Sequence, residues 1–122
     1  MDRVKQRTDA LAKANRYRFA VSRKKREIGA MSMHEGCQEL ADLIEHSDCP
    51  MMLSGRVQDW LMTPNRIGIR KASQAMVCIK VRKADRRLRD LTPRQREELA
   101  DIVRHGFNVR EWRRSQLLEQ AA

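Results

Sequence analysis

Aromatic and turn-forming residues are scarce in this chain of 122 residues. Phe, Trp and Tyr together make up 4% of the sequence, and there are five Gly and three Pro. A β-sandwich or barrel needs aromatic and β-branched strands joined by frequent turns, so this composition argues against an all-β fold. What remains favours Ala, Leu, Met, Arg, Glu and Gln, which are good helix formers, and it predicts a single all-α domain.

Long hydrophobic runs and a paired set of cysteines are also lacking. No run of about 18 apolar residues is present, which excludes a membrane-spanning helix. The segment Met1 to Lys5 lacks the apolar stretch of a signal peptide, so we expect a cytoplasmic protein. Three cysteines, an odd number, predict no disulfide framework in a reducing compartment. The hydrophobic fraction of 41% is still too high for a wholly disordered basic tail.

Acidic residues are outnumbered, and the excess positive charge is concentrated in two blocks. The chain has 26 Lys and Arg against 16 Asp and Glu, for a net charge of +10. Residues 1–30 carry +7 and residues 63–96 carry +9, whereas residues 31–62 carry −5 and residues 97–122 carry −1. This distribution indicates a folded scaffold with two basic surfaces, for which a polyanion is the natural partner. The alternative is that both blocks are ordinary solvated helix faces.

The first basic block predicts one long helix. Residues 2–28 contain neither Pro nor Gly, and Gly29 is a plausible end. Its apolar stripe is thin and consists of Val4, Leu11, Ala14, Tyr17, Val21 and Ile28. So narrow a stripe cannot bury the helix deeply, and most of its circumference must face solvent or a partner. Arg16, Arg23 and Lys24 lie on that part and are candidate contacts with a polyanion.

Shorter helices with clear starting signals follow. Ser32 with Glu35, and Thr92 with Pro93 and Gln95, are patterns typical of capped helix N-termini. Apolar spacing predicts four buried faces, made of Met33, Cys37, Leu40, Ala41 and Ile44, of Val57, Trp60 and Leu61, of Ile69, Ala72, Met76 and Ile79, and of Leu99, Ile102, Val103 and Phe107.

The remaining segments are assigned more coarsely. Residues 82–91 predict a short helix or turn with Leu88 and Leu91 facing inward, and residues 107–122 predict a further helix around Val109 and Trp112. The chain then divides into a long basic helix over 1–30, a globular helical domain over 31–105 and a C-terminal helical extension over 106–122.

A glycine-containing hairpin between two helices is the most specific motif. Gly68 allows close approach to a phosphate, and the free N–H groups that begin the next helix point at the same place. An arrangement of this kind binds the phosphate backbone of any duplex and does not recognise its bases. The candidate contacts are Arg66, Gly68, Ile69, Arg70 and Lys71. The alternative is an ordinary connection in which Gly68 is only a turn residue.

A second candidate surface is the arginine-rich run that follows. Because Leu88 faces inward, the arginines around it are free to project, and guanidinium groups suit phosphates or a narrow minor groove. The candidate contacts are Arg82, Arg86, Arg87, Arg89 and Arg94. The alternative is again a solvated basic face.

Together these stretches resemble the actinobacterial (mycobacterial-type) integration host factor family, which is unrelated in fold to the two-subunit β-ribbon protein of the same name. The matching residues follow the family's order: Trp60, Leu61 and Pro64, then Ile67 to Ala72, Gln74 to Met76, Arg86 to Leu91 and Arg94 to Arg96. The preceding helix and the basic N-terminal helix match in kind, so the resemblance spans roughly residues 8–103.

The resemblance implies a helix–two-turns–helix fold and a nucleoid-associated protein that binds double-stranded DNA with little sequence preference. It further implies DNA bending or compaction and assistance to phage site-specific recombination. The family's contacts fall on Arg86, Arg87 and Arg89 and on Gly68, Arg70 and Lys71. Two family glycines are replaced by Asp90 and Thr92, which introduces a repelling carboxylate, and the tail beyond Val103 exceeds the usual family end.

Two other functions remain open on these residues. An RNA- or ribosome-associated protein would use the same phosphate-binding device, since that device does not distinguish DNA from RNA. A protein-interaction module is the third interpretation, with the acidic residues 31–62 or the tail at 107–122 docking a recombinase or the transcription machinery.

Metal binding and catalysis are not expected. His34 with Cys37 and His46 with Cys49 have ligand-like spacing, but the two histidines flank the ends of one helix, about 18 Å apart. Cys37 lies on an apolar stripe and is expected in the core. No P-loop, nucleophile elbow or HExxH pattern is present. We therefore expect a binding protein without a cofactor or metal, and not an enzyme.

Overall fold

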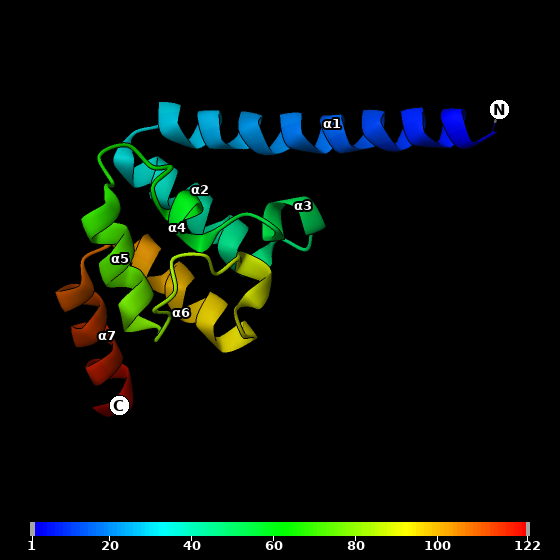
Figure 1. Ribbon diagram of the computed structural model, residues 1–122. Helices are drawn as coiled ribbons and strands as arrows, with labels where there is room; N and C mark the ends of the chain where they lie inside the picture. The colour runs from blue at the N-terminus through cyan, green and yellow to red at the C-terminus, as the bar shows by residue number, and fades with distance from the viewer. Residues whose placement is uncertain (1, 122) are drawn as a thin grey trace.

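The computed structural model describes residues 2–121, and this part of the chain is all-α (Figure 1). The elements in order are α1 (Asp2–Ala30), α2 (Met33–His46), α3 (Pro50–Leu53), α4 (Val57–Leu61), α5 (Ile69–Cys78), the 3₁₀ turn η1 (Leu88–Asp90), α6 (Pro93–Arg104) and α7 (Val109–Ala121). The predicted all-α fold with a long N-terminal helix is confirmed. No helix within residues 2–121 is both long and apolar enough to cross a membrane.

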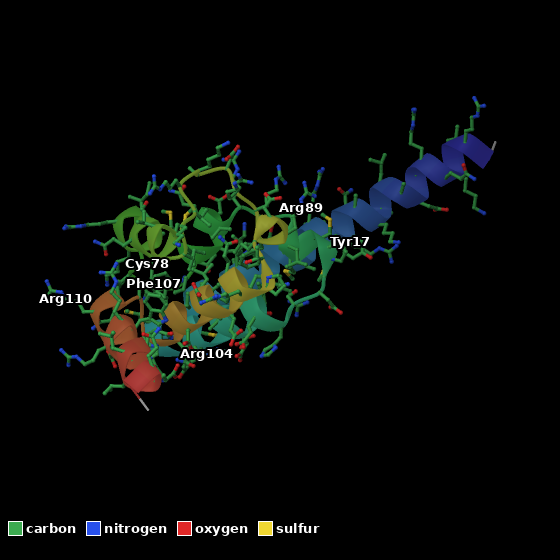
Figure 2. The ribbon with its side chains drawn as sticks, turned by 90° about the horizontal axis from the view of Figure 1, so that it is seen from below. Tyr17, Cys78, Arg89, Arg104, Phe107 and Arg110 are labelled. Atoms are coloured by element: carbon green, nitrogen blue, oxygen red, sulfur yellow. The ribbon has the colours of Figure 1, made fainter. Side chains whose placement is uncertain are left out.

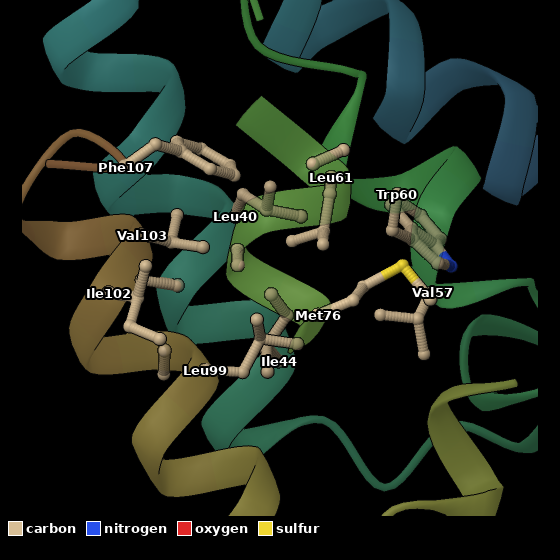
Figure 3. Packing of buried hydrophobic residues seen from close by; sticks show 14 of the residues in the cluster. Leu40, Ile44, Val57, Trp60, Leu61, Met76, Leu99, Ile102, Val103 and Phe107 are labelled. Atoms are coloured by element: carbon tan, nitrogen blue, oxygen red, sulfur yellow. The ribbon is translucent and has the colours of Figure 1, made fainter. Parts of the chain in front are cut away.

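The core is built on the pairing of α2 with α6, and the α4–α5 pair covers it. Leu40 and Ile44 of α2 are fully buried against Leu99, Ile102 and Val103 of α6 (Figure 3). These side chains recur every three or four residues, so each helix buries one stripe. The predicted buried faces of α4 and α6 are confirmed, and so is that of α2 except for the partly buried Met33. The inward positions of Leu88, Leu91 and Trp112 are confirmed as well.

The acidic stretch contributes carboxylates to the same helix pairing. Arg104 of α6 forms ion pairs with Asp42 and Glu45 of α2. Burial lowers the pKa of Arg104, but its hydrogen bonds to Glu45 and Asp42 outweigh this effect, and the pKa lies above its ordinary value. Glu39 of α2 pairs with Lys24 of α1. Much of the acidic block on α2 therefore neutralises cations of the neighbouring helices.

The N-terminal half of α1 projects from the rest of the molecule (Figure 1). Val4, Leu11 and Tyr17 are exposed, and only Val21 and Ile28 of the predicted apolar stripe pack against the core. The prediction that Gly29 ends the helix is wrong, because α1 continues through it to Ala30.

The start of α6 agrees with its local signals, whereas other elements differ from expectation. Thr92 and Gln95 form a complete capping box on α6. At the start of α2, only one of the two capping hydrogen bonds forms. The Ser32 side chain accepts from the N–H of Glu35, but the Glu35 side chain does not accept from the N–H of Ser32. Ile69 is exposed rather than buried, because it opens α5 outside the core. The helix α3 was not expected, and Pro50 occupies its first turn, where a missing N–H costs nothing.

Arg96 holds the end of α2 in place. Its Nε donates to the carbonyl of Ile44 at 2.8 Å and its Nη2 to that of Ser47 at 2.6 Å. Carbonyls at a helix C-terminus have no partner within the helix, so this guanidinium supplies the missing donors. Arg96 is thus a structural residue, although its position in the arginine-rich region resembles a binding residue.

Replacing Arg96 by Met is expected to lower the free energy of unfolding by about 2–3 kcal/mol, because two charge-assisted hydrogen bonds are lost. Lys should restore only part of this loss, since one ammonium lacks the planar fork that reaches both carbonyls. The matched control is Arg94→Met, whose exposed ion pair with Glu98 contributes little. Urea denaturation followed by circular dichroism would measure all three variants, and equal effects at the two positions would contradict the assignment.

Candidate nucleic-acid interface

The short helix α4 connects the two candidate basic segments and lies below α1 (Figure 1). Its residues Val57, Trp60 and Leu61 are fully buried. The Nζ of Lys25 on α1 lies 5.1 Å from the centre of the Trp60 ring, and the Trp60 Nε1 donates to the carbonyl of Met52 at 3.0 Å. The first contact joins α1 to α4, and the second joins α4 to α3. Sequence reasoning missed the role of Lys25, because nothing local to residue 25 indicates an aromatic ring 35 positions away.

The predicted hairpin follows α4 and leads into α5. Arg66 is the residue with a left-handed backbone, at φ 68°, whereas Gly68 has φ −100°, which any residue can adopt. Gly68 therefore does not use the positive φ that a glycine allows, but the space around it is open. A Cβ at Gly68 would meet nothing within 4 Å.

The start of α5 is left without a side-chain cap. Gly68 occupies the capping position and offers no side-chain acceptor, so the first-turn N–H groups remain available. Arg70 and Lys71 in that turn are exposed. This helix N-terminus thus combines free N–H donors, open space at Gly68 and two cationic side chains, which together suit an anionic oxygen.

The arginine-rich segment lies at the opposite end of α4. An antiparallel bridge joins Arg56 to Arg87, where the Val57 N–H donates to the Arg86 carbonyl at 2.9 Å. The Leu88 N–H donates to the Gly55 carbonyl at 3.1 Å, and the Leu88 side chain is fully buried. This anchoring leaves the side chains of Arg86 and Arg89 exposed.

Arg87 and Asp90 play local structural roles in this segment. The Arg87 guanidinium donates to the carbonyl of Ser54 at 2.8 Å, and the Asp90 carboxylate accepts from the Arg87 N–H at 3.0 Å. Asp90 therefore stabilises the turn where the resembled family has a glycine. Arg87 is exposed but already engaged, so we separate it from Arg86 and Arg89 as a candidate contact.

The two basic segments are held at opposite ends of α4, with the hairpin after Leu61 and the arginine segment at the Arg56–Arg87 bridge. Along the chain the hairpin precedes α5, and the arginine segment follows α5 after a loop that returns to the start of α4. A Cβ on Gly29 of α1 would lie 3.4 Å from the Thr63 carbonyl in the hairpin. At the other end, α3 contacts both α1 and η1. The hairpin, the arginine segment and α1 thus frame the α4–α5 pair.

The predicted site residues divide by their ion pairs. Three are paired: Arg23 with Glu27 at 3.5 Å, Arg94 with Glu98 at 3.0 Å, and Lys24 with Glu39. The others form no ion pair with the described carboxylates and are exposed, namely Arg16, Arg66, Arg70, Lys71, Arg82, Arg86, Arg87 and Arg89. Unpaired, exposed cations retain their full attraction for a polyanion.

The histidines and cysteines do not gather into a site. His34 and His46 are exposed at the two ends of α2, and no cluster of three or more metal-ligating side chains occurs in the described part of the chain. Cys37 is buried in the core, as predicted. Burial raises the pKa of its thiol, against the weaker opposing effect of Lys71, so Cys37 stays neutral.

The arrangement of a free helix N-terminus and exposed cations can bind an extended anion. Comparisons of the chain with protein-family models, curated proteins and solved structures find no match.

Proposed function

We propose that this chain is a DNA-architectural protein that binds the phosphate backbone of double-stranded DNA with little sequence specificity. The observation that carries the proposal is the uncapped N-terminus of α5, which opens onto free space at Gly68 beside the unpaired cations Arg70 and Lys71. Helix N-termini with free N–H groups are ready-made phosphate sites. Contacts of this kind position a protein on DNA without reading its bases.

The second basic segment supports a duplex as the polyanion. Duplex DNA presents one negative charge per ~1.7 Å of helix axis, so two basic segments at opposite ends of α4 can meet separate phosphates of one duplex. The guanidinium groups of Arg86 and Arg89 are suited to such contacts. The resemblance to the actinobacterial integration host factors points to the same ligand, and with it to a nucleoid-associated role in DNA bending and site-specific recombination.

The helix α1 provides a further basic surface. Its projecting half carries Arg3, Lys5, Arg7, Lys13, Arg16 and Arg18, all of them exposed. A long basic helix beside the compact basic surface allows one molecule to follow a bent duplex or to bridge two. Bending then gains extra phosphate contacts, which offset the elastic cost of deforming DNA.

Binding to a 30-base-pair duplex is expected to weaken steeply with salt. Each neutralised phosphate contributes about −0.9 to the slope of log K against log salt, so six contacts give a slope near −5. Fluorescence anisotropy at 50–300 mM NaCl would measure the slope, with two duplexes of unrelated sequence giving equal values. An affinity that barely changes with salt, or that differs strongly between the sequences, would contradict the proposal.

The nature of the polyanion is tested by competition. Unlabelled duplex DNA should displace the labelled duplex more effectively than single-stranded DNA or A-form RNA of the same length and at the same salt concentration. Preferential displacement by RNA would replace the proposal with the RNA-associated alternative.

A further inference from the structure

One apolar side chain is exposed within the proposed phosphate-binding surface. Ile69, the first residue of α5, is 59% exposed, whereas Ile67 on the other side of Gly68 is buried in the core. The two residues that follow it, Arg70 and Lys71, are exposed cations. Ile69 therefore contributes neither to the core nor to the charge of the surface, and it lies at the place where the proposed ligand would make contact.

The side chain of Ile69 leans toward the space in which a phosphate would bind. The Cα–Cβ bonds of a helix tilt toward its N-terminus, so the side chain of the first residue covers the space beyond the helix end. The backbone N–H groups of Ile69, Arg70 and Lys71 point to the same space, and none of them has a hydrogen-bond partner within residues 2–121. A phosphate oxygen bound by these N–H groups would lie beside the Ile69 methyl groups.

The chemistry of the nucleic-acid backbone determines what such a side chain contacts next. Each phosphate is bonded through oxygen to the C3′ carbon of one sugar, and the neighbouring carbon, C2′, carries two hydrogens in DNA but a hydroxyl in RNA. Ile69 offers only carbon and hydrogen to this part of the sugar. It can therefore pack against deoxyribose, whereas a ribose hydroxyl at the same place would lose its water and gain no partner.

We propose that Ile69 is a specificity-determining residue, which favours deoxyribose over ribose beside the phosphate bound at the N-terminus of α5. This role rests on the proposed function and adds to it the feature by which the site selects its ligand. The N–H groups and the cations attract phosphates of either nucleic acid, and Ile69 supplies the discrimination between them. Gly68 leaves room for the sugar, since even a Cβ at this position would meet nothing within 4 Å.

Two A-form duplexes separate the effect of the hydroxyl from that of helix shape. Double-stranded RNA and its 2′-fluoro analogue of the same sequence share the A-form and differ in the group at C2′, where fluorine donates no hydrogen bond. We expect the protein to bind the 2′-fluoro duplex about fivefold more tightly than RNA at equal salt concentration, because no hydroxyl is then buried against Ile69. Fluorescence anisotropy would measure both affinities, and equal values would overturn the proposal.

Ile69→Thr is expected to abolish this preference, so that the two A-form duplexes bind with nearly equal affinity. Threonine keeps a branched side chain and supplies a hydroxyl that can pair with the ribose 2′-OH. The position is exposed, so the variant should fold normally, which circular dichroism would verify. A preference that persists in the folded variant would overturn the assignment to Ile69.

The matched control is Val77→Thr on the same helix. Val77 is also branched and is 61% exposed, but it lies near the other end of α5, where Cys78 adjoins Phe107 (Figure 2). This variant should retain the preference for the 2′-fluoro duplex. An equal loss in both variants would show that the discrimination does not arise at the N-terminus of α5.

The salt dependence of binding to duplex DNA separates this role from the proposed function. Ile69→Thr removes no charge, so the slope of log K against log salt should be the same as in the wild-type chain. If the wild-type chain showed no salt-dependent binding to DNA, the proposed function would fail. A normal slope together with equal affinities for the two A-form duplexes would contradict only the role of Ile69.

A positional test uses the isoleucine methyl groups in the complex with duplex DNA. In protein with labelled isoleucine methyls, the Cδ1 methyl of Ile69 should show nuclear Overhauser contacts to the H2′ and H2″ protons of deoxyribose. The methyl of Ile67 is buried and serves as the internal control without such contacts. No contact from Ile69, or contacts to base protons alone, would overturn the proposal.

Discussion

Replacing Arg70, Lys71, Arg86 and Arg89 together by Gln is expected to weaken binding to duplex DNA by about a hundredfold at 100 mM salt. Four phosphate contacts at about 0.9 each should also make the slope of log K against log salt shallower by about 3 to 4. The loss should be the same for duplexes of unrelated sequence, since these contacts go to phosphates. All four side chains are exposed and unpaired, so the variant should remain folded.

A matched pair of double variants separates specific contacts from overall charge. Arg86→Gln with Arg89→Gln removes two charges from the proposed interface, and Arg110→Gln with Arg114→Gln removes two from α7. The first pair should reduce the slope by about 2, whereas the second should leave it nearly unchanged. Equal losses from the two pairs would mean that net charge alone attracts the DNA, without a defined interface.

Replacing Trp60 by Ala is expected to lower the free energy of unfolding by about 3–5 kcal/mol. The indole is fully buried, donates to the Met52 carbonyl and carries the ammonium of Lys25 over its ring. Its removal leaves a cavity beneath α1 and an acceptor without its donor. Thermal melting followed by circular dichroism should show a midpoint lowered by more than about 10 °C.

The second tryptophan supplies the control for the role of the indole nitrogen. Trp60→Phe should cost about 1–2 kcal/mol beyond the effect of Trp112→Phe, because the Trp60 Nε1 is bonded and the Trp112 Nε1 is buried without a partner. A larger effect at Trp112 would contradict this account. DNA affinity measured below the melting transition should fall for Trp60→Ala as well, since α4 sets the distance between the hairpin and the arginine segment.

Local signals in the sequence were sufficient for most helices of the core. The Thr92 cap and the inward positions of Leu88 and Leu91 depend on residues within a few positions of one another, and the structure confirms them. The projecting part of α1 could be anticipated from its thin apolar stripe. The exposure of Ile69 could not be predicted, because it depends on how the hairpin positions the start of α5 relative to the core.

The candidate site was less predictable, because a basic side chain looks the same in the sequence whether it is free or engaged. Arg96 bonds to carbonyls about 50 residues earlier, and Arg87 bonds to Ser54 across 33 positions. Lys24 meets Glu39 on another helix. Only the three-dimensional structure shows that these cations already have partners within the molecule, whereas Arg70, Lys71, Arg86 and Arg89 do not. The positions of the hairpin and the arginine run were nevertheless identifiable, because glycine and clustered arginine mark them directly.

The unsupported half of α1 has a thermodynamic consequence. Helicity there depends on backbone hydrogen bonds and intrinsic propensity alone, without a packed face, and repulsion between neighbours such as Arg3 and Arg7 opposes it. A polyanion lying along this segment would remove that repulsion and so shift its helix–coil equilibrium toward the helix. Part of the binding free energy would then be spent on ordering the backbone, and the enthalpy and heat capacity of association would include a folding contribution.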